Sequence, residues 1–490
     1  MSLTELDSLD KIVSLSKARG FVFQSSEIYG GLGAVYDYGP LGAELKRNIR
    51  DLWWHHMTRL HDNIVGLDSA IFMHPKVWEA SGHVGGFNDP MIDDKQSNKR
   101  YRADMLIEGY IEKLKGDGKE EEAAGVQEQL DTAGSREGIC EDLHAIIMEH
   151  EIRAPGSGAF EWTDVRQFNL MFKTQFGATS SGEDGDSVYL RPETAQGIFV
   201  NFKNVMDTSR QQIPFGIAQV GKAFRNEVVA RQFVFRMREF EQMEMQYFVE
   251  PGNDEELYEE WLDKRFDWHK ALGIRPRKLD IHRHPEDKLA HYAAAAADIV
   301  YDYPIGWQEV EGVHNRTDFD LSRQAEFSGK KLEYFDQAEQ KRYTPYVVET
   351  SVGLDRLVMM ALCDAYREEE VDGDTRTVLK LNPKIAPTKI GIFPLIKKDK
   401  LQDLAHKITD DLRKDYNVLY DESGSIGKRY RRQDEAGTPF CVTVDFDGVE
   451  SEGEDTVTIR YRDDMTQDRV AVSRLREVLS DKMESWEPED

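Results

Sequence analysis

The stretch GKAFRNEVVARQFVFRMREFEQMEMQYF, residues 221–248, decides the fold that we predict for this chain of 490 residues. We expect one strand over Ala223–Glu227, a polar loop over Val228–Gln232 and a returning strand over Phe235–Phe248. Alternate side chains of a strand point to the same face of a sheet. The stretch therefore predicts a β-hairpin whose two faces differ in chemistry.

One face of this hairpin combines charge with an aromatic ring. Its residues are Arg225, Glu227, Phe240, Gln242, Glu244 and Gln246. A guanidinium can bind two phosphate or carboxylate oxygens at once, a ring can stack on a purine, and a carboxylate accepts from an amine. The face predicts a site for a nucleotide and an amino acid. The alternative is a solvated hairpin with cross-strand ion pairs.

A second element supports the binding site over that alternative. The segment ETSVGLDR, residues 349–356, is a polar strand end followed by a glycine, and it leads into an apolar helix with Arg356 in its first turn. Together the two stretches resemble motifs 2 and 3 of the class II aminoacyl-tRNA synthetases.

Further stretches resemble the homodimeric glycyl-tRNA synthetases and follow that family's order. They are YDYGPLGAELK (36–46), SGHVGGF (81–87), YRADMLIE (101–108), RQFNLMF (166–172), YLRPETAQGIF (189–199) and RYRRQDEAGTPFCVTVD (429–445). The resemblance covers nearly the whole chain, except the segment around residues 112–160.

The resemblance implies an α+β fold. A catalytic domain would be built on an antiparallel sheet flanked by helices, with an inserted helical module and a C-terminal α/β anticodon-binding domain. We expect residues 1–111 to form the N-terminal part of the catalytic domain with motif 1, 112–160 an acidic insertion, 161–383 the catalytic core with motifs 2 and 3, and 386–490 the anticodon-binding domain.

The reaction implied by the resemblance is the ATP-dependent attachment of glycine to tRNA(Gly). The glycine carboxylate attacks the α-phosphorus of ATP to give glycyl-adenylate and pyrophosphate, and a ribose hydroxyl of the tRNA then takes the glycyl group and releases AMP. Because that carboxylate is already ionised, positioning and charge neutralisation must supply the catalysis.

By resemblance, Arg225 and Arg356 are the catalytic residues, the first at the α-phosphate and the second at the γ-phosphate. Glu309 should hold Mg²⁺, an ion that commonly bridges carboxylate and phosphate oxygens. The implied ATP-binding residues are Arg225, Asn226, Glu227, Phe235, Arg236, Arg238, Glu239, Phe240, Glu309, Val310, Gly353, Leu354, Asp355 and Arg356.

Glutamates at family positions should surround the amino group of glycine. The implied glycine-binding residues are Arg102, Glu193, Phe240, Glu241, Gln242, Glu244, Arg316, Glu349, Thr350, Ser351 and Gly353. The implied tRNA-binding residues are Lys428, Arg429, Arg431 and Arg432. Because overpacking can exclude every side chain larger than that of glycine, we expect no editing domain.

The N-terminal region resembles motif 1, the dimer interface of class II synthetases. Pro40 suits the first turn of a helix over Leu41 to about His61, and the strand-like segment 63–75 follows. Packing within one chain is the alternative, but the family implies a two-fold homodimer.

Composition and cysteine content limit where the protein can act and which sites it can contain. No run of about 18 apolar residues predicts a membrane span, and the N-terminus lacks the pattern of a secretory or transit peptide, so we expect a cytoplasmic protein. Three scattered cysteines argue against disulfides. The family that the chain resembles often carries a cysteine-rich zinc knuckle just before the RQFNLMF stretch, but segment 152–160 at that place has no cysteine, so no structural zinc is expected. The net charge of −28 does not exclude RNA binding, because local basic patches can bind phosphate.

Other patterns give local expectations. We predict a helix over Leu3–Ala18, a tightly packed helix over Ala293–Ala297, a shared face for Glu309 and Glu311, and a basic turn around residues 428–432. The insertion should be partly helical and solvent-facing.

Three other functions are compatible with parts of the sequence. A non-catalytic relative could bind nucleic acid on the same scaffold, but it would not need Arg225, Glu227 and Arg356. An amide ligase would need no tRNA-binding domain. A synthetase for threonine, proline or histidine would share the C-terminal unit, but its motif 2 differs from FRNE followed by MREFEQME.

Overall fold

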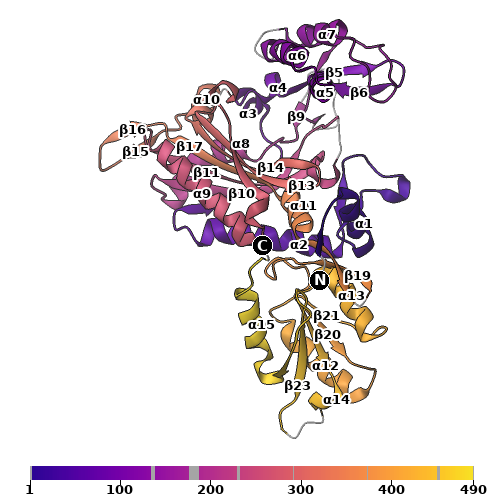
Figure 1. Cartoon of the computed structure of the whole chain (residues 1–490). Coiled ribbons are helices and arrows are strands. Elements are labelled where there is room, and N and C mark those ends of the chain that lie inside the picture. The colour runs from indigo at the N-terminus through magenta and orange to yellow at the C-terminus, as the bar shows by residue number, and fades with distance from the viewer. Residues whose placement is uncertain are drawn as a thin grey trace.

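The computed structural model shows three bodies along the chain (Figure 1). A catalytic-type core lies in the middle, a helical module lies above it, and a C-terminal α/β unit lies below it. The N- and C-termini meet near the junction of the core and the C-terminal unit. The structure describes residues 3–133, 138–175, 187–228, 232–290, 292–371, 373–449 and 453–488.

The core is built on a seven-stranded sheet. Its order is β12 (Leu279–Arg283), β13 (Ala295–Tyr303), β14 (Gly306–Thr317), β17 (Tyr346–Gly353), β11 (Glu239–Val249), β10 (Phe215–Phe224) and β4 (Ile64–Gly66). All neighbours are antiparallel except β4 and β10, which are parallel. The antiparallel sheet predicted for the core is confirmed.

Helices cover both faces of this sheet. Apolar residues of α2 (Pro40–Arg59) and α9 (Asp254–Leu272) pack against one face with α11 (Leu354–Ala365). On the other face, α8 (Ala195–Ser209) packs against β10 and β11 through a separate apolar cluster. The rest of this second face remains available for polar side chains.

Two predicted helices are wrong in part or in whole. Leu3–Glu5 forms strand β1, which pairs with β18 (Tyr366–Val371), and helix α1 begins only at Leu9 and ends at Arg19. Most of the run Ala293–Ala297 belongs to strand β13, which has a partner strand on each side. Pairing within the sheet overrides the helix propensity of alanine here.

The predicted shared face for Glu309 and Glu311 is also wrong. The register between β13 and β14 shifts so that Ile299 pairs with Glu311 and Val300 pairs with Glu309. One residue, Val310, is therefore extra on β14 and forms a β-bulge, which reverses the alternation of side chains.

The inserted module has its own core. Its sheet is β6 (Lys99–Arg102), β5 (Asn88–Asp94) and β7 (Arg166–Asn169), and its helices are α5 (Ala103–Gly116), α6 (Glu120–Ala133) and α7 (Ile139–Glu149). An apolar cluster runs from Ile92 to Val165. The expected helices are present; their inner faces pack together in this core, and their outer faces carry exposed residues.

The C-terminal unit is a five-stranded sheet with helices. Its order is β21 (Val418–Tyr420), β20 (Ile390–Pro394), β22 (Phe440–Val444), β23 (Thr456–Tyr461) and β24 (Gln467–Ala471), with helices α12 (Asp399–Leu412), α13 (Ile426–Ala436) and α15 (Leu475–Glu484). The predicted basic turn is wrong, because residues 428–432 lie inside α13.

The other helices and strands lie between these elements along the chain. They are β2 (Val22–Gln24), β3 (Tyr36–Tyr38), α3 (Pro75–Ala80), α4 (His83–Gly86), β8 (Lys173–Gln175), β9 (Ser187–Tyr189), α10 (Phe319–Ser328), β15 (Tyr334–Asp336), β16 (Lys341–Tyr343), β19 (Asp374–Leu379) and α14 (Phe446–Val449). Among the described residues, no helix is both long enough and apolar enough to cross a bilayer.

Candidate active site

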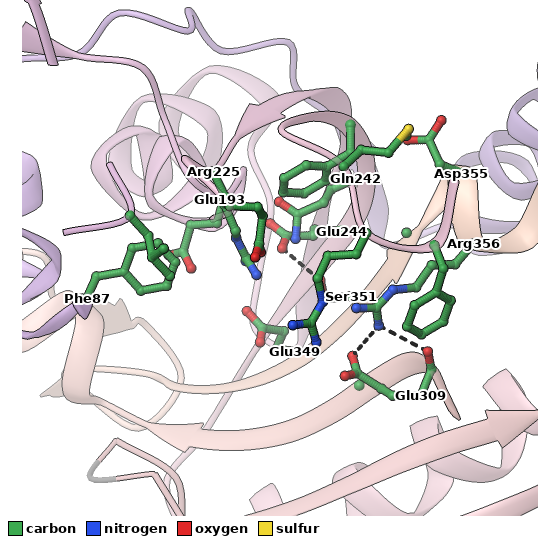
Figure 2. Close-up of a pocket in the computed structure, with 18 of the residues that line it drawn as sticks. Phe87, Glu193, Arg225, Gln242, Glu244, Glu309, Glu349, Ser351, Asp355 and Arg356 are labelled. Atoms are coloured by element: carbon green, nitrogen blue, oxygen red, sulfur yellow. Dashed lines mark hydrogen bonds and ion pairs between the residues drawn. The ribbon is translucent and has the colours of Figure 1, made fainter. Parts of the chain in front are cut away.

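A cavity of about 470 Å³ opens on the face of the core sheet that carries polar side chains. The residues predicted from the sequence that line it are Arg102, Glu193, Arg225, Glu227, Phe235, Arg236, Phe240, Gln242, Glu244, Glu309, Arg316, Glu349, Ser351, Gly353, Asp355 and Arg356. Residues from the hairpin, from β14 and from the start of α11 thus meet in one place (Figure 2).

Other predicted residues lie outside the lining. They are Asn226, Arg238, Glu239, Glu241, Val310, Thr350 and Leu354. Thr350 alternates with Glu349 and Ser351 on β17 and therefore points to the opposite face, where it is fully buried. Glu241 instead forms an ion pair with Lys46 of α2.

Arg225 is held just beyond the end of β10. That strand covers Phe215–Phe224, so the bounds predicted for it, Ala223–Glu227, are wrong at both ends. The Nε of Arg225 donates to the Pro192 carbonyl at 3.0 Å. Its guanidinium lies 5.4 Å from the Phe87 ring and 5.3 Å from the Phe240 ring, so aromatic groups flank the cation on two sides.

Arg238 supports this segment from behind. Its Nε donates to the Glu227 carbonyl at 3.0 Å, and its Nη1 donates to the Gly33 carbonyl at 3.2 Å. The Arg225 N–H in turn donates to the Arg238 carbonyl. Arg238 therefore fixes the backbone instead of facing the cavity. Residues 229–231 of the predicted loop lie outside the described residues.

Arg356 and Glu309 face each other at the other end of the cavity (Figure 2). The Arg356 Nη1 lies 3.2 Å from Glu309 Oε1 and donates to the Glu309 carbonyl at 3.0 Å. Burial acts to raise the pKa of Glu309, but the charge and hydrogen bond of Arg356, with the charges of His314 and Arg225, together outweigh burial and lower that pKa. The cavity thus offers an ionised carboxylate beside a guanidinium.

Two buried glutamates, Glu244 and Glu349, and the partly buried Glu193 form the floor between these two ends. Glu244 accepts from the Thr194 hydroxyl at 2.5 Å and from the Ser351 hydroxyl at 2.8 Å. Burial, followed by the charges of Glu349 and Glu193, raises the pKa of Glu244 to about 8. Glu244 is therefore a protonated acid near neutral pH.

Glu349 and Glu193 remain ionised because cations and donors contact them. Burial acts to raise the pKa of Glu349, but Arg316 at 3.2 Å and His314 at 2.8 Å lower it to about 2. Burial acts to raise the pKa of Glu193, but the charges of His83 and Arg316 and the hydrogen bonds from His83 and Gln196 together lower it. A small cation would find three carboxyl groups here, two of them charged.

Some lining residues were not predicted from the sequence. They are Phe87, Asp89, Leu170, Val234, Met237, Tyr292, Gly312 and His314. Phe87 and Leu170 belong to stretches quoted above for their resemblance, so that signal was present. Strict alternation along β14 would place Gly312 and His314 on the face opposite to Glu309. The bulge at Val310 reverses the alternation, so all three residues face the cavity.

The predicted basic patch on α13 is only partly exposed. Arg429 is buried, and its guanidinium donates to the carbonyls of Pro394, Asp421 and Leu395. Its role is therefore to join α13 to the sheet, and we do not retain it as a tRNA contact. Lys428 is exposed, and Arg431 and Arg432 are partly exposed.

In the part of the chain that the structure describes, no three His, Cys, Asp or Glu side chains form a group that could hold a metal ion by themselves. A nucleotide-bound Mg²⁺ brings phosphate and water oxygens as further ligands, so one carboxylate can be enough for it. Glu309 fits that requirement, because it is ionised and half of its side chain is exposed to the cavity.

Comparison with known proteins gives three family matches. Residues 172–366 match the class II tRNA synthetase core domain (G, H, P, S and T), residues 389–482 match an anticodon binding domain, and residues 89–131 and 118–170 match glycyl-tRNA synthetase insertion domain 1.

Similar proteins of known name are glycine–tRNA ligases. The one from Chlorobaculum tepidum is 56% identical over 476 residues, which cover 97% of this chain and 100% of that protein. The one from Treponema denticola is 51% identical, over 96% of this chain and 95% of that protein. The solved prolyl-tRNA synthetase of Cryptosporidium parvum with L-proline and AMP has a TM-score of 0.61 at 13% identity, covers 97% of this chain and 75% of that one, and shares the fold.

Proposed function

This chain belongs to the glycine–tRNA ligases, which are class II aminoacyl-tRNA synthetases, and from that membership we propose how its cavity carries out the reaction. The enzyme attaches glycine to tRNA(Gly) with ATP, through a glycyl-adenylate. The observation that carries the proposal is the arrangement of the cavity. A fixed guanidinium lies at one side, three carboxyl groups form the floor, and a second guanidinium lies at the far end.

Glycine would bind between Arg225 and the floor. Its carboxylate would face the Arg225 guanidinium, which Pro192 and two aromatic rings already hold in place. Its ammonium group would lie among Glu193, Glu244 and Glu349. This orientation leaves the nucleophilic oxygen directed toward the centre of the cavity, where the α-phosphate would lie.

ATP would fill the space between Arg225 and Arg356. The base would stack against Phe240, with Glu227 accepting from its amino group, and Arg356 would neutralise charge on the terminal phosphate. Class II synthetases use ATP with Mg²⁺, and the bound ion supplies further charge neutralisation at the phosphates. Glu309 would hold that ion and would exchange its ion pair with Arg356 for contacts to the nucleotide.

The acceptor tRNA would contact the C-terminal unit as well as the cavity. The anticodon-binding unit carries Lys428, Arg431 and Arg432 on α13, and we propose these three as phosphate contacts. They form a local positive patch on a strongly acidic chain, and such patches attract nucleic acid regardless of net charge.

We also propose a two-fold dimer that acts in the cytoplasm. Leu60 and Phe72, on either side of β4 in the motif 1 region, are 63% and 44% exposed, which leaves apolar surface for a second copy. All three cysteines are unpaired, as suits a reducing compartment. Sedimentation equilibrium at micromolar concentration should give twice the chain mass, and a monomer would contradict the dimer.

ATP–pyrophosphate exchange without tRNA tests the proposed site. The purified protein should exchange label with glycine and with none of the other nineteen amino acids. Arg225→Ala should lower the rate by about 10²- to 10³-fold, the usual loss when an oriented donor to developing charge is removed. Lys203→Ala, which removes an exposed lysine of α8, is the matched control and should leave the rate unchanged. Equal activity in the Arg225 variant would reject the assignment.

A further inference from the structure

The inserted module is attached to the core by two short segments that both contact the candidate active site. We call these segments the stem: residues 81–87, which lead out of the core, and residues 166–170, which lead back. The stem includes α4 and strand β7, which is also the edge strand of the module's sheet. None of its residues was among the predicted site residues.

The outgoing segment contacts both sides of the proposed glycine pocket. The His83 Nε2 lies 3.3 Å from Glu193 Oε2, and its Nδ1 lies 2.8 Å from the Ser81 hydroxyl. Four residues later, the Phe87 ring packs 5.4 Å from the Arg225 guanidinium. Figure 2 shows Phe87 on the same side of the cavity as Glu193 and Arg225.

The returning segment is hydrogen-bonded both to the outgoing segment and to the backbone beside Arg225. The Asn169 side-chain amide donates to the Val84 carbonyl at 3.1 Å, and the Leu170 N–H donates to the Phe87 carbonyl at 3.0 Å. The Leu170 carbonyl then accepts from the Asn226 N–H at 2.7 Å. Asn226 directly follows Arg225, so one continuous set of hydrogen bonds links α4 to the Arg225 backbone.

We propose that the stem positions both ends of the amino-acid site: His83 orients the Glu193 carboxylate, and Phe87 together with Leu170 orients Arg225. The placement of the inserted module on the core thereby sets how well the site accepts glycine. This inference rests on the proposed function, because it takes Glu193 and Arg225 as the groups that hold the ammonium and carboxylate of glycine.

These contacts predict that a displaced stem would affect glycine more than ATP. His83 contacts Glu193, while Arg356 at the nucleotide end contacts Glu309 and the Phe235 ring. Without the His83 side chain, the Glu193 carboxylate would still accept from the Gln196 side chain at 3.2 Å and feel the Arg316 charge, but it would lose the ring that Ser81 holds against it. Glu193 would then be free to turn away from the ammonium group.

Steady-state ATP–pyrophosphate exchange on the full-length protein, without tRNA, tests this inference. His83→Ala should raise the KM for glycine about tenfold, the effect of removing one hydrogen bond to a charged group, with the KM for ATP within about twofold of the parent. Phe87→Leu should lower kcat by about fivefold, because Arg225 loses one flanking ring. Glu128→Ala, at an exposed position of α6 in the same module, is the control and should change neither constant.

A third variant keeps the inference testable if His83→Ala does not fold. Asn169 does not line the cavity, yet Asn169→Ala removes the donor that holds α4. It should raise the KM for glycine in the same direction while kcat stays within about twofold. A uniform fall in kcat with an unchanged KM for glycine, in both variants, would mean a merely structural role and would overturn the inference.

The failure of the proposed function is distinguishable from the failure of this inference. If the parent protein shows no exchange with glycine, the proposed function itself fails. If the parent exchanges and Glu193→Gln raises the KM for glycine, while His83→Ala and Asn169→Ala leave it unchanged, the inference alone fails.

Discussion

Glu309 and Glu311 lie two residues apart on one strand, yet their carboxylates are on opposite faces of the sheet. Glu309 is half exposed in the cavity beside Arg356. Glu311 is fully buried against α9, where Arg265 donates to it at 2.6 and 3.1 Å and His269 lies 2.8 Å away. The bulge at Val310 separates the two roles.

Glu311→Ala should therefore destabilise the fold, whereas Glu309→Ala should not. Removing Glu311 leaves the Arg265 guanidinium buried without its partner, which costs about 3 to 5 kcal/mol. Removing Glu309 takes away a half-exposed partner and should change stability by less than about 1 kcal/mol. Thermal unfolding of the two variants side by side measures the difference. Equal shifts in Tm would contradict the opposite placement of these carboxylates.

The raised pKa of Glu244 predicts how glycine binding depends on pH. Its folded-state pKa of about 8 lies above the ordinary value, so the stability it contributes is present at low pH and is lost as the pH rises toward 8. Binding of an ammonium group should favour the ionised form and release a proton. The KM for glycine should therefore fall as the pH rises from about 6 to about 8.

Calorimetry in two buffers of different ionisation enthalpy measures that proton directly. Glu244→Gln is the matched variant, because it keeps the shape and a hydrogen bond to the Ser351 hydroxyl but cannot ionise. It should bind glycine more weakly, with no release of a proton from this position. Proton release of the same size in the variant would assign the titration to another group.

Much of the fold could be predicted because long segments keep one pattern from end to end, either that of a helix or that of a strand. Pro40 begins α2 as its position suggested, and the apolar segment after Arg356 forms α11. The return strand of the hairpin is also confirmed in its main part, since β11 covers Glu239–Val249. In these cases local sequence and tertiary packing favour the same structure.

The errors arise where distant partners decide the outcome. Nothing near Leu3–Glu5 shows that β18 lies beside it, and nothing near Ala295 shows that strands flank it on both sides. The bulge at Val310 depends on the register with β13, so its effect on Glu311 could not be seen from alternation. In the same way, Arg429 lies in a basic run, but the carbonyls that accept its guanidinium come from other segments.

The junction between the core and the C-terminal unit is a buried charge network. Asp434 of α13 accepts from Arg376 of β19 at 2.8 Å and from Arg460 of β23 at 2.8 and 3.0 Å. Arg376 also donates to Glu369 of β18. The network therefore connects the helix that carries the basic patch to the strands that follow α11.

Asp434→Asn should weaken this junction without changing glycine activation. The neutral amide leaves two buried guanidinium groups undercompensated, which costs about 3 kcal/mol. We expect a lower Tm and a higher KM for tRNA, while the kcat of ATP–pyrophosphate exchange without tRNA stays within about twofold of the parent. Asp410→Asn, an exposed site on α12, is the control. A parallel loss of exchange activity would show that the junction also shapes the catalytic cavity.

The exposed charges of α13 predict the salt dependence of tRNA binding. Lys428→Ala combined with Arg431→Ala should raise the KM for tRNA and reduce the slope of log affinity against log salt by about one for each phosphate that is no longer neutralised. Exchange without tRNA should be unchanged, because both side chains lie outside the cavity lining. Lys407→Ala on α12 removes an exposed positive charge elsewhere in the same unit and serves as the control. If the double variant and the control give the same slope, the tRNA must bind another face of the C-terminal unit.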